Sequence, residues 1–354
     1  MIKKDLISKR YINDGVPLIR TNTLQSRYLN RFLNDRNIKY KSMKKCLICN
    51  SENFTLISEK DRYGIPLKTV VCNNCGIIFR LEQMTGKSLK IFYSKYYRRI
   101  YDAKDNIDFN EIEKKYGFHS KGKIPSFINK RSVVVEIGCG GGWNLMPYLR
   151  ERIMHFGFDY DNDYIEYGKK KGLNLFLGGI DMAHRMGIKT DYVLLAHMLE
   201  HTENPILFLR DLKLILKKTA IVNIFIPSRN LLLFGGGGTG FDLLGTLQNA
   251  HNFLFDKTTI KYVGFQAGFK VLVNIGGSNV VLKNISYEIQ VKNITEKKQR
   301  GEKIIKYLKF IEKVLPYKQK FSISDDLLYK IFIRLHFRQV LKKIYFFRVK
   351  KYRG

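Results

Sequence analysis

A glycine-rich loop that follows a short apolar strand is the feature that most restricts how this chain can fold. Residues 133–137 form an apolar run typical of a strand, and Gly138, Gly140 and Gly142 follow it before a helix-like segment. Glycines let a backbone approach a bound cofactor without Cβ clashes, and the start of the next helix offers free amides and the positive end of a dipole. The pattern predicts a strand–loop–helix unit that binds a cofactor.

A second strand follows at the spacing of a βαβ unit. Residues 155–158 form a short apolar run that ends at Asp159, whose carboxylate can accept hydrogen bonds from the two hydroxyls of a ribose. The glycines do not match the dinucleotide fingerprint, because Trp143 occupies the position of its third glycine. The pattern present is instead an acidic residue, Glu136, followed by glycine at every second position.

These residues resemble the first motif and the second strand end of class I S-adenosylmethionine-dependent methyltransferases, and the matching positions are Glu136, Gly138, Gly140, Gly142 and Asp159. The resemblance continues through residues 191–201, which are similar to the fourth strand and the Leu-Glu-His segment of these enzymes, and it covers residues 131–290. It implies an α/β fold with a Rossmann-like seven-stranded methyltransferase sheet, and methyl transfer from S-adenosylmethionine.

The residues expected to bind the cofactor are Glu136, Gly138, Cys139, Gly140, Gly142, Asp159, Asp181 and His197. Asp181 follows the expected third strand, and two interpretations stay open for it: contact with the adenine amino group, or capping of a helix. We interpret Cys139 as a small loop residue and not as a nucleophile, because no base lies beside it in the sequence.

The catalytic candidates are His201, Glu200 and His251. The sulfonium of the cofactor is already electrophilic, so the protein must mainly align the acceptor and assist the loss of a tightly held proton. His201 is the leading base, with Glu200 orienting it or binding the acceptor, and His251 is the second candidate. Alternatively, Glu200 and His201 cap the helix that begins near Asn204 or satisfy backbone groups.

Four of the five cysteines form two CxxC pairs, Cys46 with Cys49 and Cys72 with Cys75. Strand-like segments lie between the pairs, as in the hairpin that joins the two knuckles of a zinc ribbon. Four thiolates complete the tetrahedral set that zinc prefers and leave no position open for water. We therefore predict a structural zinc ion, with Gly76 supporting the turn after the last cysteine.

The combination of this ribbon with the Leu-Glu-His segment is similar to the zinc-ribbon methyltransferases of bacterial sugar and surface-glycan pathways. The resemblance implies O- or C-methylation of a small-molecule acceptor, such as a nucleotide sugar or glycan precursor. The expected organisation is a basic N-terminal extension over 1–42, the zinc ribbon over 43–87, a helical linker over 88–130, the methyltransferase domain over 131–290 and a basic helical tail over 291–354.

The linker contains four tyrosines for which two interpretations stay open. They either cover a substrate pocket or pack the ribbon onto the next domain, and they are Tyr93, Tyr96, Tyr97 and Tyr101.

The charge balance of the chain is strongly basic, with 63 Lys and Arg residues against 31 Asp and Glu and a formal net charge of +32. This charge suits nucleic acid, an anionic membrane or an acidic glycan as a partner. The basic residues are spread widely, which favours a general compositional bias. Two alternative functions stay open: an RNA methyltransferase that uses the basic surface, although no Asn-Pro-Pro-Tyr motif is present, and a non-catalytic zinc-containing binding protein.

The ends of the chain carry no targeting segment that we can identify. The N-terminus is charged, and no run of about 18 apolar residues occurs, so we expect a cytoplasmic protein. Residues 329–351 form a basic amphipathic pattern that either rests on an anionic membrane or docks on the catalytic domain. Residues 235–240 fit GxGxxG but lie outside a βαβ unit, and we interpret them as a lid over the acceptor.

Overall fold

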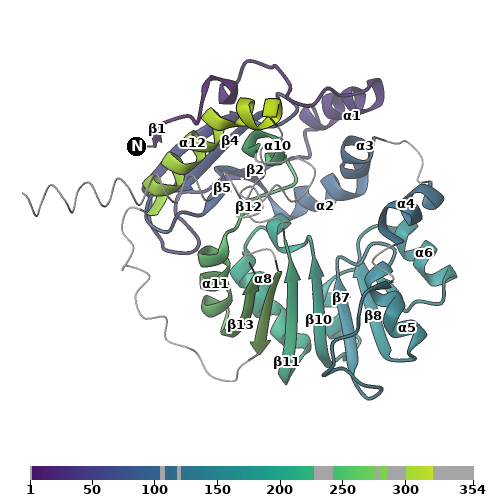
Figure 1. Ribbon diagram of the computed structural model, residues 1–354. Helices are drawn as coiled ribbons and strands as arrows, with labels where there is room; N and C mark the ends of the chain where they lie inside the picture. The colour runs from purple at the N-terminus through teal and green to yellow at the C-terminus, as the bar shows by residue number, and fades with distance from the viewer. Residues whose placement is uncertain are drawn as a thin grey trace, which may run out of the picture.

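A seven-stranded sheet forms the centre of the larger half of the molecule (Figure 1). The computed structural model describes residues 2–103, 108–117, 121–226, 242–275, 279–284 and 300–321. The strands are β7 (Val133–Ile137), β8 (Met154–Asp159), β9 (Leu175–Leu177), β10 (Thr190–Ala196), β11 (Leu216–Phe225), β13 (Phe269–Ile275) and β14 (Asn279–Asn284). Their order is β13-β14-β11-β10-β7-β8-β9, and only β14 is antiparallel to the others. The predicted α/β methyltransferase sheet is therefore confirmed.

Both faces of this sheet are covered, because successive side chains of a strand point to opposite faces. Val134 packs into one apolar cluster with residues of α5 and α6, whereas Val135 packs into another with residues of α7, α8 and α11. The helices are α5 (Met146–Arg150), α6 (Asn162–Lys170), α7 (Ile180–Arg185), α8 (Pro205–Leu212) and α11 (Lys257–Gln266), and the short 3-10 helices are η3 (Trp143–Leu145), η4 (Leu199–His201) and η5 (Lys213–Ile215). This layering holds the parallel strands so that their carboxyl ends meet at one edge.

A second sheet of five strands contains the cysteine knuckles, in the order β1-β3-β4-β5-β12. Its strands are β1 (Lys3–Lys4), β3 (Phe54–Lys60), β4 (Pro66–Cys72), β5 (Ile78–Arg80) and β12 (Phe253–Leu254). The sheet takes one strand from the N-terminal extension and one from the segment before α11, so it is larger than the predicted hairpin. The pairing of β12 with β5 joins the second sheet to the methyltransferase part of the chain.

Three helices lie beside the second sheet: α1 (Thr23–Leu33), α2 (Gly86–Lys95) and α3 (Tyr97–Tyr101). Asn22 begins α1 with a capping box, and Thr85 caps α2. Their apolar sides meet around Phe92, which is fully buried. A small pair of strands, β2 (Tyr40–Ser42) and β6 (Glu82–Met84), connects them to the sheet, and α4 (Phe109–Tyr116) lies against α6.

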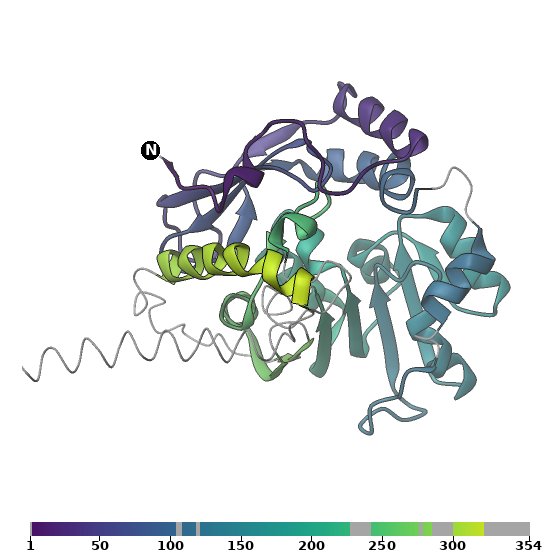
Figure 2. The same cartoon turned by 45° about the horizontal axis from the view of Figure 1, so that its top comes forward.

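The helix α12 (Arg300–Phe321) packs on the second sheet, as both views of the molecule show (Figures 1 and 2). Gly301 N–H donates to the Asn73 carbonyl at 3.0 Å, and a Cβ at Gly301 would meet the Cys72 carbonyl oxygen at 2.6 Å. Near the middle of the helix, Glu312 accepts hydrogen bonds from Ser8 and Arg10, the latter on the 3-10 helix η1 (Lys9–Tyr11). The start of the chain is therefore bonded to α12, and α12 is bonded to the sheet that carries the cysteines.

Two expectations fall outside the described residues: the lid at 235–240 and the amphipathic segment at 329–351. The short helix α10 (Leu243–Thr246) follows the first of these segments. Within the described ranges, no helix combines the length and apolarity needed to cross a membrane.

Candidate active site

The glycine loop after β7 takes a left-handed turn at every second residue. Gly138, Gly140 and Gly142 have φ of 76°, 52° and 79°, values that favour glycine. A Cβ at Gly138 would lie 3.0 Å from the sulfur of Met198, so the loop and the segment after β10 approach closely. The amides of Gly138 and Cys139 both donate to the Phe158 carbonyl, which ties the loop to β8. The predicted strand–loop–helix unit is present.

Glu136 lies under this loop with its side chain buried. Asn144 donates to one of its oxygens at 2.6 Å, and the other oxygen has no hydrogen-bond partner among the described residues. Burial raises the pKa of Glu136 to about 8, and the neighbouring Asp159 adds to the rise. Buried polar groups are normally hydrogen-bonded, so this second oxygen can pair with a hydroxyl or an amine of a bound molecule.

Asp159 ends β8 and faces the glycine loop. Its carboxylate accepts from the Gly140 amide at 2.8 Å and from the Asp161 amide at 2.9 Å. Burial raises the pKa of Asp159, while these two amides oppose the rise. Glu136, the glycine loop and Asp159 thus come together at the carboxyl edge of the sheet, where the cofactor of a doubly wound fold binds.

The other two cofactor candidates lie farther out. Asp181 is in the first turn of α7, is mostly exposed and pairs with Arg185 at 3.1 Å. Gly179 is the N-cap residue of α7, so the interpretation of Asp181 as the cap is wrong. His197 follows β10 with φ of 53° and a mostly exposed side chain, and the carboxylate of Glu200 raises its pKa.

The three catalytic candidates come together beside this edge. The Glu200 carboxylate is fully buried and has no hydrogen-bond partner in the described part of the chain, and it lies 3.4 Å from His197 Nδ1 and 3.8 Å from His201 Nε2. The His201 and His251 rings meet at 4.9 Å between centroids. Burial lowers the pKa of His251, so this imidazole is held neutral.

The tautomer of His201 follows from its surroundings. Its Nδ1 lies 2.9 Å from the Ala250 carbonyl oxygen, which can only accept, so Nδ1 carries the proton. Nε2 then faces Glu200 and is available to take or hold a proton. The helix α8 is capped by the side chain of Asn204, so Glu200 and His201 do not cap this helix. The His201 ring does bond a backbone carbonyl, as the second part of that alternative expects.

The turn over residues 248–252 ties the acceptor side of the site together. Asn252 donates from its amide to the Glu200 carbonyl and from its side chain to the carbonyls of His201 and Thr202. Gln248 lies 2.6 Å from His251 Nε2. This turn leads into β12 and therefore couples the histidine pair to the second sheet.

Two residues of the linker helices complete the site: Tyr93, one of the tyrosines predicted to cover a substrate pocket or to pack the ribbon, and Arg98, for which the sequence predicts no role. Tyr93 packs edge-on against the His201 ring at 5.8 Å, and its buried hydroxyl has no hydrogen-bond partner among described residues. Arg98 donates to Asp161 at 2.8 Å and stacks on Tyr164 at 3.5 Å. Tyr93 and Tyr97 therefore face the candidate base, and all four linker tyrosines also pack in the apolar cluster around Phe92.

Residues 107–273 match the family model of a methyltransferase domain. The glycine loop, the acidic end of β8 and the strand order all lie within this stretch. The chain carries a class I S-adenosylmethionine-dependent methyltransferase domain. Among curated proteins, none matches the chain.

Several solved structures are similar to the methyltransferase domain. A methyltransferase of Archaeoglobus fulgidus is 18% identical, with 56% of this chain and 100% of that chain covered and a TM-score of 0.34. One of Thermotoga maritima is 18% identical, with 51% and 96% covered and a TM-score of 0.35. The plantazolicin methyltransferase, bound to a substrate analogue and S-adenosylhomocysteine, is 15% identical, with 56% and 97% covered and a TM-score of 0.39.

The four CxxC cysteines lie together, with their sulfur atoms within 4.8 Å of one another. The two knuckles repeat the same backbone bonds: Asn50 N–H donates to the Cys46 carbonyl and Gly76 N–H to the Cys72 carbonyl, both at 2.9 Å. Asn50 and Gly76 both have positive φ, which turns the chain back after each pair. The donor set and its fold fit a tetrahedral zinc site.

The ligand atoms of Glu200, His201 and His251 also lie within 4.8 Å of one another. Two imidazoles and a carboxylate can hold a metal ion with one position open. The same three groups can equally act as a proton-transfer set, and metal analysis separates the two interpretations.

Proposed function

We propose that the methyltransferase domain transfers a methyl group from S-adenosylmethionine to an oxygen or carbon of a sugar or glycan precursor, with His201 as the base. The observation that carries this proposal is the geometry of His201. Its Nδ1 is held by the Ala250 carbonyl, and its Nε2 points toward a buried carboxylate at the edge where the cofactor loop ends.

The cofactor, when bound, supplies an electrophilic methyl group on its sulfonium. The chain's own part is to hold the cofactor and position the acceptor. The glycine loop offers close backbone approach, and Asp159 offers a carboxylate to ribose hydroxyls. His201 takes the acceptor's proton at Nε2, and Glu200 stabilises the imidazolium that forms.

We also propose that Cys46, Cys49, Cys72 and Cys75 hold a structural zinc ion. The repeated knuckle geometry supports this assignment, because both pairs present their sulfurs from the same tight turn. The ion would fix the second sheet, and through β12 it would fix the turn that contacts His201.

The experiment is a calorimetric titration of the zinc-replete protein with S-adenosylmethionine and, separately, with NADH. We expect S-adenosylmethionine to bind and Asp159→Ala to weaken it at least tenfold, which corresponds to about 1.4 kcal/mol. Asp191→Ala is the matched control, because Asp191 accepts from Val133 N–H at the start of β10, at the edge of the same sheet opposite to Asp159. Binding of NADH alone, or no binding at all, would contradict the proposal.

A further inference from the structure

Arg80, at the end of β5, is a buried cation without an acidic partner. Its side chain is 3% exposed, and its guanidinium donates to the backbone carbonyl of Asn249 and to the Asn249 side-chain oxygen at 3.2 Å. In the described part of the chain no carboxylate forms an ion pair with it, and its Nε has no hydrogen-bond partner. The Tyr40 ring lies 5.8 Å from the guanidinium carbon and offers the cation a π face but no negative charge. Burial of a charge without an ion-pair partner is costly, so the site favours a ligand group that carries a negative charge.

A buried carboxylate, that of Asp61, bonds the same Asn249 side chain as Arg80 and also accepts hydrogen bonds from other groups. Asp61 is fully buried and accepts from the amides of Tyr63 and Ile65 at 2.8 and 3.0 Å. Its other oxygen accepts from the Asn249 side chain at 3.1 Å, so the amide stands between this carboxylate and Arg80. Burial raises the pKa of Asp61 to about 6, so this carboxylate is still largely ionised at neutral pH, and the Asn249 side chain separates its charge from Arg80.

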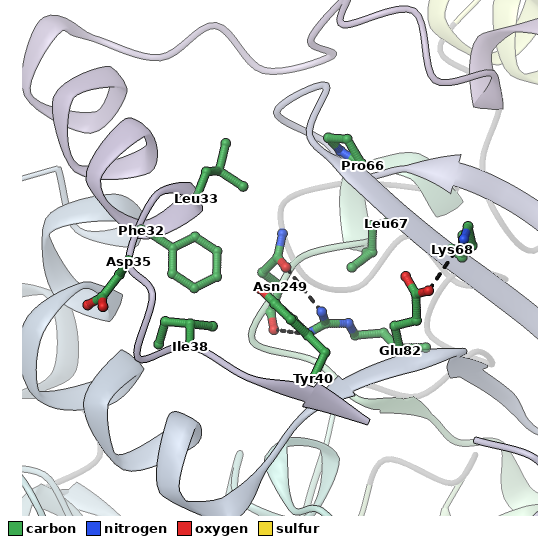
Figure 3. Close-up of a pocket in the computed structure, with 11 residues that line it drawn as sticks. Phe32, Leu33, Asp35, Ile38, Tyr40, Pro66, Leu67, Lys68, Glu82 and Asn249 are labelled. Atoms are coloured by element: carbon green, nitrogen blue, oxygen red, sulfur yellow. Dashed lines mark hydrogen bonds and ion pairs between the residues drawn. The ribbon is translucent and has the colours of Figure 1, made fainter. Parts of the chain in front are cut away.

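The guanidinium of Arg80 borders a pocket of about 190 Å³ that opens between α1 and the β3–β4 hairpin. Figure 3 shows Phe32 and Ile38 on one side, Pro66 and Lys68 on the other, and Asn249 between them. The pocket is therefore lined by both apolar and charged side chains, with the Asn249 side chain between its two sides.

Two carboxylates at the rim of the pocket have partners of their own. Asp35 accepts from the Tyr96 hydroxyl at 2.7 Å and from the Asn37 amide at 2.8 Å. Glu82 is half exposed and lies 3.3 Å from Lys68. They face solvent, where charge is screened, and they can accept from hydroxyl groups, whereas Arg80 is the buried group.

The pocket is connected to the candidate base through consecutive residues. Asn249 holds Arg80, and the next residue, Ala250, holds His201 through its carbonyl. Arg80 also borders a second, smaller void that His251 lines. A ligand group at Arg80 and an acceptor atom at His201 would thus contact opposite sides of one turn.

We propose that Arg80 and Asn249 bind an oxyanion group, a phosphate or a carboxylate, on the acceptor of methyl transfer. Guanidinium forks pair with planar carboxylates and with phosphates through two parallel hydrogen bonds. The rim carboxylates would take hydroxyls of the same molecule, so a sugar that carries a charged group matches both features. The inference rests on the proposed function, because it assigns this site to the acceptor.

The test is a calorimetric titration of the full chain with inorganic phosphate, glucose 1-phosphate, glucuronate and, as the neutral comparison, glucose. We expect at least one charged probe to bind ten times more tightly than glucose, and Arg80→Met to remove this preference. A phosphate preference would identify a sugar phosphate, and a glucuronate preference a sugar acid. Equal binding of all four probes, or no binding, would overturn the proposal.

Stability measurements separate ligand binding from a structural role. A buried unpaired charge replaced by an apolar side chain of similar length leaves the melting temperature unchanged or raises it. Arg80→Met should therefore fold and lose the charged probes, and a large drop in its melting temperature would count against the proposal. Arg80→Lys provides a second variant that keeps the charge but loses the fork, and it should bind the probes at least threefold more weakly.

Lys68→Met is the matched control, because Lys68 is a half-exposed cation at the same pocket. It should keep at least half of the probe affinity. If Lys68→Met weakens probe binding as much as Arg80→Met does, the charged group binds at the rim of the pocket and the assignment to Arg80 is contradicted. S-adenosylmethionine affinity is measured on every variant. Probe binding without cofactor binding would refute the methyltransferase proposal alone, and cofactor binding without charged-probe preference would refute only the Arg80 assignment.

Discussion

The cofactor side and the acceptor side of this site are built in different ways. The cofactor side consists of backbone amides and of the carboxylates of Glu136 and Asp159. All of them belong to residues 136–161, within one βαβ unit. The acceptor side collects side chains from the linker helices, from the end of β10 and from the turn at 248–252. The first can form wherever the large sheet folds, whereas the second also needs the cysteine sheet in place.

Removing a zinc ligand should have the largest effect on the difference between the cofactor side and the acceptor side. In Cys72→Ser we expect the zinc content to fall and the second sheet to lose several kcal/mol of stability, because metal binding contributes on the order of 10 kcal/mol in isolated zinc modules. Methyl transfer should be lost while S-adenosylmethionine still binds. Metal analysis, thermal melting, initial-rate kinetics and calorimetry measure the zinc content, the stability, the methyl transfer and the cofactor affinity.

Cys139→Ser is the control for this experiment, since Cys139 is buried in the glycine loop and lies outside the cysteine cluster. It should keep the zinc. Loss of cofactor affinity in Cys72→Ser would show that the two sides are one cooperative unit, and an unchanged zinc content would reject the four-cysteine site.

A smaller change removes only the proton-transfer atom of the acceptor side. His201→Asn keeps a donor for the Ala250 carbonyl and removes Nε2, so turnover should fall roughly 10²- to 10⁴-fold with the cofactor affinity unchanged. Initial-rate kinetics with a methyl acceptor identified by screening charged sugars would measure it.

His155→Asn is the matched control, because His155 is also buried and its Nδ1 lies 2.9 Å from a backbone carbonyl, that of Ile153. It lies on β8 outside the catalytic cluster and should leave turnover within about threefold of the wild type. If both variants lose turnover equally, the effect of His201 is structural. The wild type could also bind a second metal ion besides the zinc of the cysteines. Loss of that ion in His201→Asn would mean that Glu200, His201 and His251 form a metal site and that His201 is not the base.

The cofactor side could be predicted from the sequence because its information is local. The apolar run of β7, the alternating glycines and the acidic end of β8 lie within 30 residues, and each step follows from strand and turn chemistry. Glu136 lies in β7 and Asp159 ends β8, as these patterns predict. The interaction of Asn144 with Glu136 is equally close in sequence, but nothing in an asparagine's type distinguishes it from a solvent-exposed residue.

The acceptor side could be predicted only in part. His201 and His251 are candidates by residue type, but the hydrogen bond that orients the His201 ring joins residues 49 positions apart. The strands β1 and β12 have two residues each, too short to show a period, so the five-stranded sheet was seen only as a hairpin. Arg80 looks like a surface arginine in sequence, and its burial depends on Asn249, 169 positions away.

The smallest effect that we expect is on the cofactor side, where Glu136 should make the folding stability depend on pH. The pKa of Glu136 is raised from 4.5 to about 8 in the folded chain, so folding favours the protonated acid. The stability that this group contributes is full below about pH 4.5 and is lost as the pH rises toward 8. Glu136→Gln mimics the protonated form and should therefore melt like the wild type at pH 5 and at a higher temperature at pH 8.5. Melting curves of the cofactor-free protein at both values measure this, with Glu82→Gln, at a half-exposed position, as the control. An equal shift at both pH values would mean that the carboxylate at 136 stays charged throughout, so that its burial is compensated within the cofactor side itself.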